Sequence, residues 1–581
     1  MAETIVSPGV LAIENDQTFT TQQPITAGAA IIGPTVKGKV GIPTIVTTYS
    51  QYQNKYGATF LSGSNTYTYF TSIAAYNYFN NGGTSLLVTR VVGEDFTPAT
   101  SSFISASAHA AGSPYNTSPF VLETISEGVI MNSDGPTGNN GTLLSGSADN
   151  FRWQIINANT GSGTFTLLIR QGSDSNISTS VLEKWGPLSL DPFSSNYIEK
   201  VIGNSVETVA SDNGEYYIQS SGNFPNLSSY VRVKQVNQTT PNYFDNVGNP
   251  KSEYTGSIPT NASGAFGGAD GKNVPTGVVA DYYENITTST NIQGISASAY
   301  TESISLLANK DAFKYNLLIA PGLLSDAGGV AYTAINNMIT TAQNRGDMMV
   351  VFDSSKHGSQ ISQALSNTSG YDTSYAATYW PWVKTVDPNT ANQVWVPAST
   401  MIPGAYAFND NIAAPWFAPA GVNRGVLSTS TQAERILTQG NRDTLYQANI
   451  NPISTYSNNG VVIFGQKTLQ KKSSSLDRIN VRRLLIELKS YISQVADTFV
   501  FEQNDAVTRN NFLSAINPYL SSVQQQQGLT SFKVIMDETN NTPNVVDNNQ
   551  LIGQIYLQPT RTAELILLDF NILPTGAIFP A

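Results

Sequence analysis

The feature that most constrains the fold is a regular alternation of strand and helix patterns in the second half of the chain. The apolar runs at 315–320 and 348–353 predict buried strands, and helical patterns follow them at 330–343 and 358–365. Strands that alternate with helices predict a parallel sheet whose crossovers are right-handed. We therefore expect an α/β domain at residues 304–460.

At 581 residues the chain is too long for one hydrophobic core, so we expect several domains in a mixed multidomain α+β fold. Residues 96–265 are rich in Ser, Thr, Asn and Gly, and include a predicted hairpin of 151–156 and 164–170. We interpret this region as a β-rich outer domain, partly an insertion, from which 102–172 should be excisable. The other predicted divisions are an N-terminal segment at 1–25, a mixed α/β body at 26–95 and 266–303, an α+β C-terminal domain at 461–559 and a C-terminal segment at 560–581.

The body is expected to combine short strands with one aromatic helix. Apolar runs at 29–32, 44–46 and 86–92 predict strands, and the pattern at 66–79 predicts a helix. Four side chains recur in this helix at a spacing of three or four residues, so they should share one face directed at the core. These residues are Tyr69, Ile73, Tyr76 and Phe79.

Two long helices and a pair of strands are predicted in the C-terminal domain. Asp477 is the predicted N-cap of the first helix. The second helix begins after Asp505, and we expect Pro518 to interrupt it and Gly528 to end it. The apolar stripe of the first helix is Leu484, Leu488, Ile492, Val495 and Phe499, and the strands are expected at 532–536 and 551–557.

Both chain ends carry apolar residues in segments too short to form a core. The N-terminal segment should either be disordered or add a strand to another sheet, and the C-terminal segment is predicted to be an edge strand that pairs with a partner. Strand addition gives backbone hydrogen bonds as well as side-chain pockets. The candidate contact residues are Ile5, Val6, Val10, Leu11 and Ile13 near the N-terminus, and Leu565, Leu567 and Phe570 near the C-terminus.

Composition argues against several classes of function. The net charge is -11, which disfavours direct binding to nucleic acid, because phosphate neutralisation needs clustered Lys and Arg. Cysteine is absent, and the two histidines, His109 and His357, are far apart, so we predict no metal or cofactor. No signal peptide or apolar stretch of membrane length is found, so no membrane insertion is expected. One basic cluster should meet an acidic protein surface: Lys467, Lys471, Lys472, Arg478, Arg482 and Arg483.

Two glycine-rich stretches imitate ligand-binding loops. Residues 33–40 place Lys39 at the spacing of a phosphate-binding loop, but Val40 has no hydroxyl to hold magnesium, and Pro43 disfavours the helix that should follow. Residues 267–271 resemble one calcium-binding Gly-Asp repeat, yet a single copy offers too few oxygen ligands. A structural turn is the favoured interpretation of both.

Short motifs in the second half of the chain resemble those of the tail-sheath proteins of contractile phage tails. Residues 414–421, Ala-Pro-Trp-Phe-Ala-Pro-Ala-Gly, resemble the family's Ala-Pro-Ala-Gly signature and predict a rigid, aromatic docking loop. Each motif alone is weak, but they occur in the family's order. The others lie at 379–382, 396–397, 404–405 with Asp410, 440–441, 460–465, 476–484 and 501–502 with Asn504.

This resemblance implies a structural, non-enzymatic subunit of a virion tail, assembled in the bacterial host cytoplasm. Such subunits form hexameric rings stacked helically around an inner tube, exchange terminal strands with neighbours, and contract to drive the tube through the host envelope. The implied partners are other copies, the inner tube protein, and the baseplate and tail terminator proteins. The resemblance places Arg482 and Arg483 on a helix of the tube-facing domain, where they are either candidate tube contacts or solvated charges of the helix.

Three alternatives remain open from the sequence. Related injection devices such as tailocins use similar sheaths. A surface-layer or adhesin protein shares the low charge and the Ser, Thr and Asn richness, although it should carry a signal peptide. A nucleotide-dependent α/β enzyme built on 304–460 is the third alternative, and tight nucleotide binding is the observation that favours it.

Overall fold

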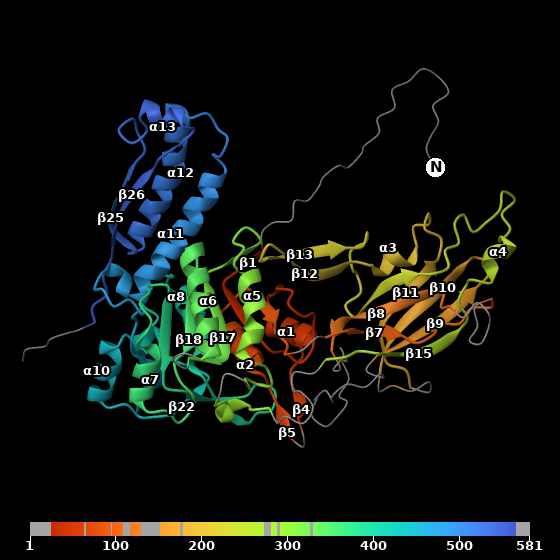
Figure 1. Ribbon diagram of the computed structural model, residues 1–581, viewed down its shortest axis with the longest axis horizontal. Coiled ribbons are helices and arrows are strands. Elements are labelled where there is room, and N and C mark those ends of the chain that lie inside the picture. The colour runs from red at the N-terminus through yellow and green to blue at the C-terminus, as the bar shows by residue number, and fades with distance from the viewer. Residues whose placement is uncertain are drawn as a thin grey trace, which may run out of the picture.

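The computed structural model describes residues 25–62, 65–93, 96–108, 117–128, 151–172, 174, 178–271, 280–287, 291–325 and 329–564. Figure 1 shows a central body of sheet and helices, a β-rich part on one side of it and a helical part that projects above it. The predicted contact residues near the two chain ends, and His109, lie outside the described residues.

An eight-stranded, mostly parallel sheet forms the centre of the body. Its strand order is β24-β23-β19-β18-β17-β2-β6-β3, in which β6 to β23 are parallel and the two edge strands are antiparallel to their neighbours. The strands are β2 (Ala29–Gly33), β3 (Thr44–Val46), β6 (Leu86–Arg90), β17 (Leu317–Leu324), β18 (Met349–Asp353), β19 (Ala376–Trp380), β23 (Asn451–Tyr456) and β24 (Gly460–Ile463). The predicted mixed α/β architecture is confirmed here.

This sheet joins two segments that the sequence assigns to different domains. Strand β2, from the segment 26–95, pairs with β17, from the segment 304–460, so that Leu318 lies opposite Ala30. Every residue of both strands is buried. Strands that are apolar on both faces must be covered on both faces, and a shared sheet with helices packed against it achieves that. The body and the α/β segment therefore share one core.

Helices α2 (Phe70–Asn80), α5 (Tyr300–Leu306) and α6 (Val330–Arg345) pack against this sheet. The prediction of a single apolar face on α2 is wrong, because the helix is buried almost all round and Tyr76, Phe79 and Asn80 are its less buried side chains. Its start is also later than predicted, because residues 65–67 form a strand. The other body elements are α1 (Tyr49–Tyr56), α7 (Ile361–Thr368), α8 (Ile402–Ile412), α9 (Gly421–Arg424), α10 (Gln439–Gln447), β1 (Ile25–Ala27), β4 (Phe60–Ser62), β5 (Asn65–Tyr67), β16 (Phe313–Tyr315), β20 (Val383–Val386), β21 (Gln393–Val396) and β22 (Ser430–Ala433).

The outer domain is a seven-stranded sheet of order β11-β10-β9-β15-β7-β8-β14 with its own core. The predicted hairpin is confirmed as β9 and β10, which are antiparallel. The largest fully buried hydrophobic side chains of the outer domain are Phe120, Phe151, Trp153, Phe165 and Phe266. The strands are β7 (Pro98–Ser101), β8 (Phe120–Glu127), β9 (Phe151–Asn159), β10 (Thr164–Gln171), β11 (Val181–Ser189), β14 (Val231–Val236) and β15 (Ala262–Gly267), with short helices α3 (Ile198–Ile202) and α4 (Ser252–Thr255).

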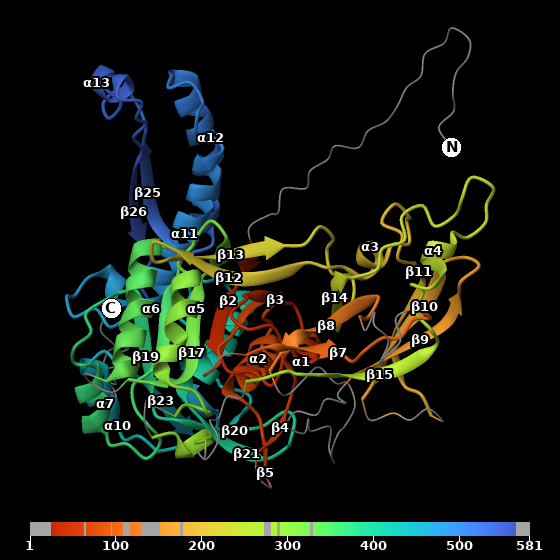
Figure 2. The ribbon, with the colours of Figure 1, turned by 45° about the vertical axis from the view of Figure 1, so that its right-hand side comes forward.

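A separate hairpin, β12 (Val206–Asp212) and β13 (Glu215–Ser221), connects the outer domain to the body. Figure 2 shows it reaching from the outer sheet across to α5 and α6. Its Val209 and Ile218 pack against the core of the body. A second link is polar, because the Lys39 ammonium pairs with the Glu127 carboxylate and the buried Arg90 guanidinium donates to the Glu127 carbonyl at 2.8 Å.

We expect the outer domain to be removable only as a whole. The Thr97 N–H donates to the Asp270 carbonyl at 3.0 Å, so a junction there matches the distance that the native backbone already spans. Deleting 98–269 with a Gly-Ser junction should give a soluble body that is destabilised by roughly 2–4 kcal/mol, through lost hydrogen bonds and exposed apolar contacts of the body. Urea unfolding of the purified variant measures this.

The smaller excision of 102–172 is the informative contrast, and the structure argues against the sequence-based expectation that it is tolerated. It removes β8, β9 and β10, which include the strands that β11 and β14 pair with among the described residues. We expect insoluble protein from it. A soluble product from the small excision, or an insoluble one from the large excision, contradicts this description of the outer domain.

The C-terminal domain pairs two long helices with an antiparallel hairpin. Its elements are α11 (Ile479–Asp497), α12 (Ala506–Gln525), β25 (Leu529–Ile535), α13 (Pro543–Asp547) and β26 (Gln554–Pro559). The predicted stripe is confirmed: Leu484 and Leu488 are in the core of this domain, and Ile492, Val495 and Phe499 pack against it.

Two local predictions about these helices are wrong. Asp477 does not cap α11. It ends a short 3-10 turn and forms an ion pair with Arg478. Arg478 is the N-cap residue, and its side chain makes no capping hydrogen bond. Pro518 does not interrupt α12, which continues through it, because tertiary packing of the flanking residues offsets the lost hydrogen bond. Asp505 does cap α12, since its carboxylate accepts from the Thr508 N–H at 2.8 Å.

Candidate functional site

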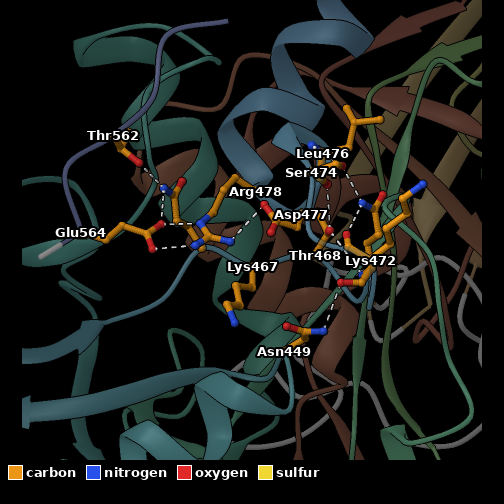
Figure 3. A network of polar contacts seen from close by, with 12 residues as sticks. Asn449, Lys467, Thr468, Lys472, Ser474, Leu476, Asp477, Arg478, Thr562 and Glu564 are labelled. Carbon is orange, nitrogen blue, oxygen red and sulfur yellow. Dashed lines mark hydrogen bonds and ion pairs between the residues drawn. The ribbon is translucent and has the colours of Figure 1, made fainter.

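The chain segment that follows β26 returns to the body and is fixed there by one carboxylate. Glu564 accepts hydrogen bonds from Arg478 Nε at 2.6 Å and Arg478 Nη2 at 3.0 Å, and from the Tyr446 hydroxyl at 2.9 Å. Figure 3 shows Arg478 between Glu564 on one side and Asp477 on the other. We call this contact of Glu564 with Arg478 and Tyr446 the C-terminal anchor.

A glutamine of the body completes the anchor. Gln466 Nε2 donates to the Thr562 hydroxyl at 2.6 Å and to Glu564 Oε1 at 3.0 Å. Burial of Glu564 opposes its ionisation, but the hydrogen bonds from Arg478, Gln466 and Tyr446 outweigh it and hold the pKa of this carboxyl below its ordinary value. The carboxylate is therefore the form that the site binds.

Replacing Glu564 with Gln should loosen the anchor without unfolding the protein. Two charge-assisted bonds are lost at a half-exposed site, so we expect a local cost of about 1.4 kcal/mol, which is a tenfold rise in local opening. Trypsin cleavage after Arg561 reports this opening and should accelerate about tenfold. The exposed Glu538→Gln is the matched control and should leave the rate unchanged.

The same anchor should be sensitive to acid. Because the pKa of Glu564 is lowered by folding, its stabilising contribution is present above the ordinary value of 4.5 and is lost as the pH falls through the lower folded value. Below that window Glu564→Gln and the parent chain should open equally, and hydrogen exchange of 560–564 measures this. A difference that persists in acid contradicts the assigned role of the carboxylate.

A groove of about 650 Å³ lies beside the anchor, and residues 560–564 form part of its wall. Its apolar lining includes Trp416, Phe417 and Phe464, and its polar lining includes Arg424 and Arg442. The predicted docking loop at 414–421 thus lines a groove, but its tryptophan is engaged within the chain. The Trp416 indole N–H donates to the Gln526 carbonyl at 2.9 Å, and the ring packs against the core of the C-terminal domain.

Arg482 and Arg483, the predicted tube contacts, were expected on the surface, and this expectation is wrong, because they are only 4% and 6% exposed. Arg483 Nη1 donates to Asp410 Oδ1 at 2.8 Å, and its guanidinium lies over the Tyr406 ring. Arg482 stacks over the Tyr375 ring at 4.0 Å. Both arginines fix α11 to the body.

The rest of the predicted basic cluster is also dispersed within the molecule. Lys467 donates to the Tyr446 carbonyl at 2.8 Å, and Lys471 donates to the Ser369 carbonyl at 2.8 Å. The acidic partner expected on another protein is, for Arg478, Glu564 of the same chain. Of the six residues of the cluster, Arg482 and Arg483 are buried, and Lys467, Lys471 and Arg478 have partners in this chain.

Residues 33–40, which resemble a phosphate-binding loop in sequence, contact the outer domain. The Gly38 N–H donates to the Ser126 hydroxyl at 2.8 Å, and the Val40 N–H donates to Glu127 Oε2 at 3.0 Å. With Lys39 also paired to Glu127, the groups that would bind phosphate already have protein partners. The turn at 267–271 is likewise structural, since the Asp270 N–H donates to the Thr97 hydroxyl at 2.8 Å.

In the described ranges His, Cys, Asp and Glu do not gather in threes as metal ligands would. Within the same ranges, every helix is too short or too polar to cross a membrane. His357 packs against the rings of Trp382 and Trp395.

Sequence reasoning missed the anchor residues Glu564, Tyr446 and Gln466. Glu564 is an ordinary acid before an apolar stretch, and its partner Arg478 lies far away in the sequence. One feature of the sequence could have indicated the anchor. An acidic residue at the start of the predicted C-terminal segment has the charge opposite to that of the predicted basic cluster. Only the fold selects Arg478 from that cluster.

Comparisons with known proteins agree with the geometry. Residues 293–469 match the phage tail sheath protein central domain, and residues 471–572 match the phage tail sheath C-terminal domain. The tail sheath protein of Vibrio phage KVP40 is 32% identical over 298 residues, which are 48% of this chain and 44% of that protein. The tail sheath protein of Enterobacteria phage T4 is 31% identical over 302 residues, which are 49% of this chain and 46% of that protein.

The alignments thus span less than half the length of these curated relatives. A sheath tail protein from Listeria innocua has the same fold, with a TM-score of 0.52 at 11% identity over 92% of this chain and 95% of that chain. The resemblance inferred from the motifs is confirmed over the region that holds the anchor and the groove. Through its central and C-terminal domains, the chain belongs to the phage tail sheath family.

Proposed function

We propose that this chain is the structural, non-enzymatic subunit of a contractile phage tail sheath. It polymerises as stacked hexameric rings around an inner tube, and the polymer contracts to drive the tube through the host envelope. The curated relatives are named tail sheath proteins of phages, which favours a virion tail over a tailocin or similar injection device. Assembly takes place in the cytoplasm of the bacterial host.

One observation carries this proposal beyond the family match: the hairpin of the C-terminal domain has open edges. Strands β25 and β26 pair only with each other among the described residues. Side chains of β26 alternate between exposed and half-buried, and Tyr556 is 56% exposed. Figure 1 shows this hairpin projecting from the body. An open two-stranded sheet is a template for added strands.

The two terminal segments supply strands of the required kind. We assign the apolar residues of the N-terminal segment, and Leu565, Leu567 and Phe570 of the C-terminal segment, to strand addition on neighbouring subunits. Connections of this kind keep a lattice linked while its rigid subunits rotate. Contraction then needs two packings of the same subunit, of which the contracted one has the lower free energy.

The partners follow from this arrangement. The subunit contacts other copies of itself, the inner tube protein, and the baseplate and tail terminator proteins at the two ends of the sheath. Because Arg482 and Arg483 are buried, the tube contact must use other residues of the C-terminal domain.

Electron microscopy of the purified chain, alone and with its tube protein, tests the proposal. We expect tubes of stacked rings, with two lengths at equal subunit number once contraction is triggered. A chain that stays monomeric with and without the tube protein, at every concentration and salt tested, contradicts a sheath subunit. Tight nucleotide binding in a titration instead supports the enzyme alternative.

A further inference from the structure

The groove beside the C-terminal anchor is apolar and open. Its lining includes Trp416, Phe417, Pro452 and Phe464, and Phe464 remains 45% exposed although its neighbours are aromatic. An exposed aromatic side chain within a groove of about 650 Å³ is typical of a binding surface. We therefore expect a protein segment to bind in this groove.

The chain that leaves the anchor provides a candidate of matching chemistry. Residues 560–564 form part of the groove wall, and residue 565 is bonded to the last of them. Residues 565–573 read Leu-Ile-Leu-Leu-Asp-Phe-Asn-Ile-Leu, so seven of nine are large and apolar. At roughly 3.3 Å per extended residue, five of them span about 16 Å, which is enough to cross a groove of this volume.

Charge also favours this occupant. Arg424, Arg442 and Arg561 line the groove together with two carboxylates, of which Glu564 is paired with Arg478 and Asp443 accepts a hydrogen bond from Gln439 at 2.9 Å. The segment carries a single charge, the carboxylate of Asp569, which complements those arginines.

We propose that in the free subunit residues 565–573 fold back into the groove of their own chain. The anchor holds this segment at the groove without an intervening linker, so its effective concentration is of millimolar order and exceeds that of any second copy in dilute solution. This contact concerns the single subunit and does not depend on the assembly proposed above.

Paired cysteines test the contact in the full-length chain. The chain has no cysteine of its own, so a disulfide can form only between the introduced residues. Ala420→Cys places one thiol in the groove lining. Leu567→Cys and Leu568→Cys, each combined with it in turn, place the other thiol on opposite sides of an extended segment. The control combines the same segment residues with Ile436→Cys, which is 75% exposed and outside the groove.

Dilute monomer is oxidised with glutathione disulfide, and gel mobility separates looped monomers from dimers. We expect at least one groove pair to form a loop about a hundredfold faster than its control pair, at a rate that is independent of protein concentration. Circular dichroism and the size-exclusion volume confirm folded monomers before oxidation.

Two results overturn the proposal. Equal rates for the groove and control pairs show that the groove is vacant in the free subunit. Disulfide-linked dimers whose yield rises with concentration assign the groove to a second copy instead. Because every measurement is made on monomers, a chain that failed to form sheaths would still give a clear answer here.

Discussion

A chain that lacks residues 1–15 is expected to remain a soluble, folded monomer and to form no extended tubes. The deletion removes Ile5, Val6, Val10, Leu11 and Ile13, the apolar residues proposed to add a strand to a neighbour. Burial of only two such side chains contributes about 3 kcal/mol, so the concentration needed for assembly should rise more than a hundredfold. Negative-stain microscopy at concentrations where the full chain assembles measures the loss, and circular dichroism verifies the fold.

Two full-length variants distinguish the effect of losing the apolar side chains from the effect of shortening the segment. Replacing Val10, Leu11 and Ile13 by Ser should reproduce the deletion, because the pockets of the neighbouring sheet lose their side chains. Replacing the polar residues 20–23 by Gly and Ser should leave assembly intact. Tubes of normal length from the deleted chain mean that the N-terminal segment is not the link between subunits.

Replacing Arg483 is expected to destabilise the subunit strongly. Removal of one partner from a buried ion pair typically costs 3–5 kcal/mol, because the other charge stays buried without compensation. Asp410 keeps some access to water, with 28% of its side chain exposed, so we expect about 3 kcal/mol for Arg483→Ala. Thermal unfolding should then begin roughly 2–3 °C lower if the 581 residues unfold together, and the shift is larger if the C-terminal domain unfolds by itself. Arg483→Glu should cost more, since burial and the nearby Asp410 already raise the pKa of Glu487.

The matched control is Lys489→Ala on the same helix, whose side chain is exposed and should change stability by no more than about 0.5 kcal/mol. A double-mutant cycle with Asp410→Ala isolates the energy of the pair from the other effects of each substitution. An Arg483→Ala subunit as stable as the parent chain contradicts the buried position of this residue. It also restores the possibility of an exposed contact with the tube.

Local sequence patterns correctly predicted those helices and strands whose structure depends mainly on neighbouring residues in the chain. The runs at 315–320 and 348–353 became β17 and β18, and the Asp505 cap and the stripe from Leu484 to Phe499 were found as expected. In each case neighbouring residues carry the whole signal, as a period, a cap or a turn. Predictions failed where a distant residue competed with the local rule, as at Pro518 and Asp477.

The sequence alone therefore determined the kinds of element, the mixed α/β class and the family, because periodicity and ordered motifs are properties of short segments. Only the tertiary structure decided that β2 and β17 share a sheet, that Arg483 faces Asp410 and that Arg478 binds Glu564. These contacts join residues far apart in the chain, and a charged side chain has the same appearance in sequence whether water or a buried partner compensates it. Burial is fixed by the packing of the whole molecule, which no local window contains.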